Sequence, residues 1–189
     1  LNPYYEKAST VIDRYKDNLA LLEDIYLKYL DLHGDEDQDG EFLAELFCRD
    51  PDFLYCYLDK ALDHMGTSFY AHNSWASRLH FVWDNETFQS YPELISDYLF
   101  EKTGEEEWRY SAIISQFVLC KNEDSDIVAK RQNAWILHTI EMHAAEPTRM
   151  HYLFGAISES SADRRRIALE KFLKLNDDYA LFEKLPLES

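Results

Sequence analysis

Hydrophobic residues recur at intervals of three and four positions along most of this chain, the spacing that places them on one face of an α-helix. The clearest stripe runs from Phe53 to Met65, and Gly66 follows it as a helix terminator. A second stripe crosses residues 18–33 and ends at Gly34. No useful length of the sequence alternates between apolar and polar residues, so the pattern predicts helices and no strands.

Prolines mark where several helices begin. Asp50-Pro51 and Glu146-Pro147 each place a capping residue before a proline, which needs no backbone N–H at the first helical position. Together with the apolar stripes, these signals predict an all-α fold of helices joined by short loops. The expected helices span residues 3–17, 18–33, 41–48, 51–65, 68–83, 92–103, 106–120, 124–144, 147–158, 161–175 and 177–184.

A short motif recurs in the second half of the chain: an arginine, two residues, an alanine and a large apolar residue. Its copies are Arg109-x-x-Ala112, Arg131-x-x-Ala134 and Arg165-x-x-Ala168. With Asp163 before it, the last copy resembles the second helix of a HEAT-type repeat, and the resemblance is best over residues 91–189. It implies antiparallel helix pairs stacked as a HEAT-like α-solenoid. Because the copies are unevenly spaced, an irregular multi-helix bundle is the alternative.

The length of 189 residues predicts a single all-helical domain over residues 1–189, with sub-halves at 1–90 and 91–189. Because the first residue is Leu1 and not methionine, a fragment of a longer protein is a further hypothesis.

The composition predicts a folded, strongly acidic protein. Apolar residues make up 46% of the chain, which is enough for a core and excludes intrinsic disorder. The 36 Asp and Glu outnumber the 19 Lys and Arg, which gives a net charge of −17. Long-range repulsion then opposes binding to nucleic acid or to an anionic membrane, and no apolar run reaches the roughly 18 residues of a membrane helix. The expected partner is a protein with a basic surface; the oligomeric state is not predicted.

The three cysteines, Cys48, Cys56 and Cys120, form no CxxC pair and lie in apolar helical stretches. Buried, reduced thiols and a cytoplasmic location are therefore expected.

One segment has a partial metal-binding pattern. Asp35-x-Asp37-x-Asp39-Gly40 matches the first half of an EF-hand calcium loop, although Leu46 stands where the loop requires a glutamate. We favour a solvated acidic loop and keep the three aspartates as weak metal candidates. Histidines such as His138 and His143 lack metal-ligand spacing, and the sequence holds no glycine-rich phosphate loop and no Gly-x-Ser-x-Gly elbow. No cofactor and no catalytic residue are predicted.

These observations favour a non-enzymatic protein–protein interaction or scaffold module with an acidic surface. The candidate partner-binding residues are Trp75, Trp83, Tyr91, Arg164 and Arg166. We expect the three aromatics to be exposed, and the two arginines to face outward while Arg165 packs inward. One alternative is a small acidic inhibitor, either an immunity-type protein or a DNA mimic, that blocks a basic site on its partner. Another is an enzyme or metal protein whose site is assembled from distant histidines and carboxylates.

Overall fold

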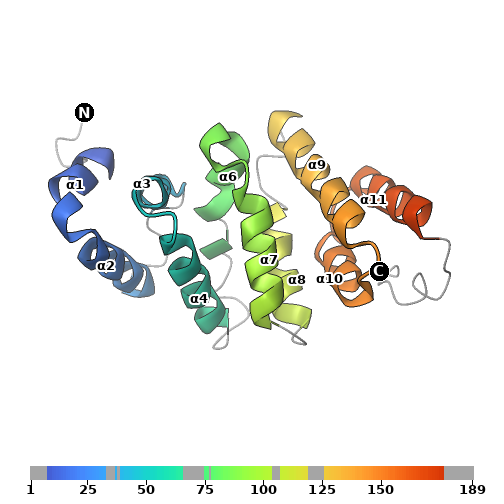
Figure 1. Ribbon diagram of the computed structural model, residues 1–189, viewed down its shortest axis with the longest axis horizontal. Coiled ribbons are helices and arrows are strands. Elements are labelled where there is room, and N and C mark those ends of the chain that lie inside the picture. The colour runs from blue at the N-terminus through green and yellow to red at the C-terminus, as the bar shows by residue number, and fades with distance from the viewer. Residues whose placement is uncertain are drawn as a thin grey trace. The chain divides into compact units, whose positions relative to one another are not determined.

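The computed structural model describes residues 8–32, 37, 39–65, 75–76, 78–103, 107–118 and 126–176. Helices and short connections account for these residues, and no strand occurs among them (Figure 1). The all-α class predicted from the apolar spacing is confirmed. The chain divides into two compact units, Leu1–Phe81 and Val82–Ser189, whereas the sequence suggested halves at 1–90 and 91–189.

In the described part of the first unit, four α-helices have defined bounds, and residues 75–76 are also helical. The four are α1 (Ala8–Arg14), α2 (Leu19–Leu32), α3 (Glu41–Arg49) and α4 (Phe53–Met65), with short 3₁₀ helices at Lys16–Asn18 and Arg78–His80. Helix α3 packs on α1 and α4, and α2 packs on α4. The buried side chains of Leu43, Phe47 and Tyr57 centre the core, and the Phe47 ring meets the Tyr57 ring edge-on at 6.2 Å.

Gly40 begins α3 at a point where the chain has no space for a side chain. Its φ of 67° lies in the left-handed region, and a Cβ atom there would lie 2.2 Å from the backbone oxygen of Arg78. Glycine is therefore required by both conformation and packing. This close approach brings the start of α3 against the end of the first unit.

The second unit contains five longer helices in its described part. They are α7 (Tyr91–Thr103), α8 (Glu107–Val118), α9 (Asp126–His143), α10 (Pro147–Ala156) and α11 (Ala162–Leu175), preceded by α6 (Phe81–Asp84), which crosses the boundary, and a 3₁₀ helix at Glu86–Phe88. Helix α10 begins at Pro147, as the proline signal predicted. Ser161 caps α11, because its side chain accepts a hydrogen bond from the Arg164 backbone N–H.

Helices two apart in the second unit pack on each other: α7 on α9, α9 on α11, and α8 on α10. Consecutive helices also meet, α7 with α8 and α9 with α10 (Figure 1). The indole of Trp83 lies in the core beneath them, where its Nε1 donates to the Phe117 carbonyl oxygen at 3.0 Å. The same indole meets Trp135 edge-on at 5.9 Å and so fixes the position of the middle of α9.

Candidate functional site

A groove of about 320 Å³ lies between the start of α7 and the middle of α9. This volume is at the lower end of the range of ligand sites. The α9 positions that line it, from Arg131 to His138, recur at intervals of three and four, so a single face of the helix is turned toward α7. The lining residues are Val82, Trp83, Gln89, Pro92, Glu93, Arg131, Ala134, Trp135 and His138.

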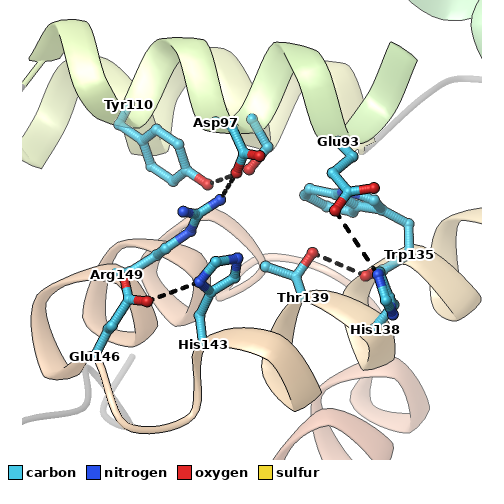
Figure 2. Close-up of polar contacts among 10 residues, drawn as sticks. Glu93, Asp97, Tyr110, Trp135, His138, Thr139, His143, Glu146 and Arg149 are labelled. Atoms are coloured by element: carbon cyan, nitrogen blue, oxygen red, sulfur yellow. Dashed lines mark hydrogen bonds and ion pairs between the residues drawn. The ribbon is translucent and has the colours of Figure 1, made fainter. Parts of the chain in front are cut away.

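Glu93 provides the carboxylate of this groove from the first turn of α7. Figure 2 shows its side chain directed toward His138, whose Nε2 lies 3.8 Å from Glu93 Oε1. Both side chains are about half exposed, at 52% and 53%. The contact is an ion pair only when the imidazole is protonated, so Glu93 keeps an uncompensated charge beside a neutral His138.

Arg131 stands at the other end of the groove and is held by the protein itself. Its Nη1 donates to the Trp83 carbonyl oxygen at 2.6 Å, and its Nη2 lies 3.6 Å from Glu86 Oε1. The guanidinium is therefore fixed in position and faces a carboxylate of its own chain.

A second, much smaller hollow of about 10 Å³ continues along the same two helices toward α10. Here Arg149 of α10 donates from Nη2 to Asp97 Oδ1 of α7 (Figure 2). The Arg149 side chain is buried, and its guanidinium lies 5.0 Å from the centre of the Phe100 ring. The carboxylate of Asp97 compensates the charge of this buried arginine, so the pair is a structural link between α7 and α10.

Tyr110 of α8 completes the buried polar group under α7. Its hydroxyl lies 2.8 Å from Ser96 Oγ. Burial raises the pKa of Tyr110, although the hydrogen bond to Ser96 and the charge of Arg149 oppose that shift. The neutral phenol is therefore a structural hydrogen-bonding group.

Two buried donors on the walls of these hollows have no hydrogen-bond partner: Trp135 Nε1 and Arg149 Nε. Trp135 is 7% exposed and lines both the groove and the small hollow. An unsatisfied buried donor costs about 1–3 kcal/mol. Such a group beside a groove is a candidate for pairing with an acceptor that arrives from outside.

Large exposed apolar side chains in the described part of the second unit occur on α7, α9 and α11. They are Leu94, Ile127, Met142, Leu173 and Leu175. The described parts of α8 and α10 expose no such side chain. In the first unit, Leu21, Ile25 and Tyr29 form an exposed row on α2 at four-residue intervals.

The structure corrects the expected exposure of Trp75, Trp83 and Tyr91. All three are buried, at 4%, 2% and 8% exposure. Large aromatic rings contribute the most apolar area to a small core, and each of these has a ring neighbour in its own unit: Tyr57, Phe117 and Phe88, respectively. Of the three, Trp83 lines the groove.

The arginine triplet on α11 is turned differently from the prediction. Arg164 is buried at 5% exposure, whereas Arg165 and Arg166 are exposed. The buried face follows a four-residue interval through Arg164, Ala168 and Phe172, and the prediction placed it one residue too late. Arg166 does lie outward, where it forms ion pairs with Glu170 at 2.9 Å and with Asp163 at 3.5 Å.

Buried Arg164 joins three helices through neutral acceptors. Its Nε and Nη2 donate to the side-chain oxygens of Asn133 and Gln132, each at 2.8 Å, and its Nη1 donates to the Val118 carbonyl oxygen at 3.4 Å. This position fits a structural cation better than an exposed partner-binding one.

The aspartate-rich segment before α3 has a capping role at Asp37. Its Oδ1 accepts from the Phe42 backbone N–H at 3.1 Å, and its Oδ2 accepts from the Leu43 N–H and the Tyr26 hydroxyl at 3.2 and 2.7 Å. Both carboxylate oxygens therefore bind donors of the protein. Asp39 is exposed, and Asp35 lies outside the described residues.

The expected burial of the cysteines is wrong for two of the three. Cys48 and Cys56 are free thiols on exposed positions of α3 and α4, because the buried faces of these helices follow Leu43, Phe47 and Tyr57 instead. Cys120 lies outside the described residues.

Within the described ranges, no three His, Cys, Asp or Glu side chains are grouped so that they would hold a metal ion. The same ranges contain no helix with the length and apolar content required to cross a membrane. No protein-family model matches the chain, and neither a curated protein nor a solved structure matches it.

Sequence reasoning missed the groove because Glu93 and Trp135 are distant in sequence and meet only through the packing of α7 on α9. One signal was present. Glu93, Asp97 and Glu101 recur every four residues, which predicts an acidic row along one face of α7. All three are exposed in the structure.

Proposed function

We propose that this chain is a non-enzymatic protein–protein interaction module whose partner docks on helices α7 and α9. The observation that carries the proposal is the groove between them, where apolar walls lie beside the carboxylate of Glu93. Exposed apolar residues on the same helices, such as Leu94 and Met142, extend the surface that a partner would cover. The net charge of −17 favours a partner with a basic surface.

The architecture that we propose for the second unit is a HEAT-like α-solenoid. Support comes from the packing of each helix on the helix two places along, with α7, α9 and α11 in one series and α8 and α10 in the other. Stacked antiparallel helix pairs produce this neighbour pattern, and they offer one series of helices as a binding face. In this proposal α7, α9 and α11 form that face.

We also propose that the protein acts in the cytoplasm. Cys48 and Cys56 are free and exposed, and such thiols persist in a reducing compartment.

Site-specific photo-crosslinking in cells that naturally produce the protein tests the proposed binding face. A photoreactive amino acid at Met142, which is 59% exposed on α9, should yield a covalent adduct with a protein of defined mass. The matched control is Thr148, an exposed position on α10. Equal adducts at both positions, or none at Met142, would contradict the proposal.

The acidic row on α7 favours a second candidate, the small acidic inhibitor. Glu93, Asp97 and Glu101 are exposed at one-turn intervals, as anionic groups that imitate phosphates would be. Asp97, however, is paired with Arg149 of its own chain. A DNA mimic should be displaced from its partner by duplex DNA and should lose affinity steeply with added salt, whereas a groove-bound partner should not compete with DNA.

A further inference from the structure

We propose that the α7–α9 groove receives a basic segment of a protein partner, with a lysine or arginine side chain of that segment paired to Glu93. This inference rests on the proposed function and names the chemistry of the partner at that site.

The charge state of the groove favours a cation at Glu93. Among the described residues, the ion-pair neighbour of Glu93 is His138, which carries a charge only when protonated. The next carboxylate on α7, Asp97, is instead compensated by the permanent charge of Arg149. Glu93 is therefore the carboxylate of this groove that gains most from an incoming lysine or arginine.

Arg131, the cation already in the groove, does not oppose this pairing strongly. Its guanidinium is bound to the Trp83 carbonyl and faces Glu86, an exposed carboxylate of the same unit. Its charge is thus offset locally by Glu86, and its Nη1 is bound to the protein.

The apolar part of the groove suits the stem of a long basic side chain. Pro92 of α7 and Ala134 and Trp135 of α9 line it next to Glu93. Lysine and arginine pack their methylene groups on apolar surfaces while the charged head reaches a carboxylate. The small side chain of Ala134, which is exposed, leaves room for such a stem.

An independent observation points to a peptide and not to a bare cation. The indole N–H of Trp135 is buried without an acceptor, and Figure 2 draws this side chain with Glu93 and His138. A backbone carbonyl of the bound segment would supply the acceptor when the Glu93 side chain turns toward the incoming cation. A polyamine offers a cation but no acceptor, so the groove should distinguish the two.

Fluorescence anisotropy with a labelled peptide of alternating lysine and serine tests the cation site. Glu93→Gln should weaken binding at least about tenfold, which corresponds to about 1.4 kcal/mol. Glu101→Gln is the matched control, because Glu101 is exposed on the same row of α7, lies outside the groove, and its replacement removes the same charge. It should change the affinity by less than about twofold. Equal effects of the two variants, or no binding of the peptide, would overturn the inference.

The indole signals of ¹⁵N-labelled protein give a second readout. The Trp135 indole N–H resonance should move on addition of the peptide and should stay in place on addition of spermine. No movement with the peptide, or equal movement with both, contradicts a carbonyl acceptor at Trp135. If Met142 crosslinks to a protein but the anisotropy and indole experiments both fail, this inference is rejected and the proposed function stands. If the crosslinking experiment fails as well, the inference and the proposed function are both rejected.

Discussion

Arg164 shows how a single residue decides the orientation of a helix in this protein. The sequence offers three consecutive arginines, and the structure buries the first of them, among oxygens of Asn133, Gln132 and Val118. Guanidinium groups carry five donors, so one buried arginine can satisfy acceptors from two neighbouring helices at once. Arg164 takes the inward position, although Arg165 fits the repeat motif, because Arg164 shares its helix face with buried Ala168 and Phe172.

Arg164→Ala should destabilise the protein by about 2–4 kcal/mol, because it leaves buried acceptors without donors and opens a cavity. Arg165→Ala should lie within about 0.5 kcal/mol of the parent, since Arg165 is exposed. Urea unfolding of the two variants measures the difference. Similar losses for both would contradict the observed orientation of α11.

Glu23 is a carboxyl whose environment disfavours its charge. Burial raises the pKa of Glu23, the charge of Asp50 raises it further, and the buried Oε1 has no hydrogen-bond partner. A carboxyl that binds its proton more tightly in the folded state opposes folding at every pH where it must be ionised.

Glu23→Gln should therefore raise the melting temperature at pH 7, by no more than about 2 °C because the side chain is only partly buried. The gain should shrink as the pH falls through the raised pKa of the folded state, and it should vanish below the unfolded value of 4.5. Thermal melting at a series of pH values measures it. A gain that is the same at pH 4 and pH 7 would exclude a charge effect.

At the level of elements, the start of α3 depends on the residues just before it. Asp37 caps the first backbone N–H groups of the helix, and Gly40 permits the close approach to Arg78. The aspartate pattern that suggested half of an EF-hand loop therefore has a local structural explanation.

Asp37→Ala should destabilise the protein by about 1–2 kcal/mol, equally in calcium and in a chelator, because a helix cap and a bond to Tyr26 are lost. Asp39→Ala, at an exposed position, should be close to neutral. Melting curves in both solutions decide the matter. If calcium raises the melting temperature of the parent protein but not of either variant, the result would instead support a metal site at Asp35, Asp37 and Asp39.

Helix positions were largely predictable from the sequence, whereas the buried face was predicted correctly for α4 but not for α2 or α11. The stripe from Phe53 to Met65 and the start at Pro147 correspond to α4 and α10 as observed. By contrast, the helix expected at 3–17 ends at Arg14 as α1, and a 3₁₀ helix at Lys16–Asn18 follows it; residues 3–7 lie outside the described residues. Local spacing and capping signals define where a helix lies, but the side that becomes buried depends on which helices pack against it.

For the whole molecule, the sequence predicted the class but not the site. The helical class follows from the spacing of apolar residues and the acidic character from the residue counts, while the large aromatics that suggested an interface are buried. The groove forms because α7 packs on α9, although α8 separates the two helices in the sequence. No local sequence pattern encodes that contact. Of the 36 acidic residues of the chain, Glu93 is one that lines this groove.

The most direct test of whether α7 and α9 form the binding face is amide hydrogen exchange. It is measured on the protein alone and on its complex with the partner that the Met142 crosslink identifies. The account predicts slower exchange in residues 91–103 and 126–143 on binding, with little change in the first unit. Protection confined to the first unit, or to α8 and α10, would contradict it.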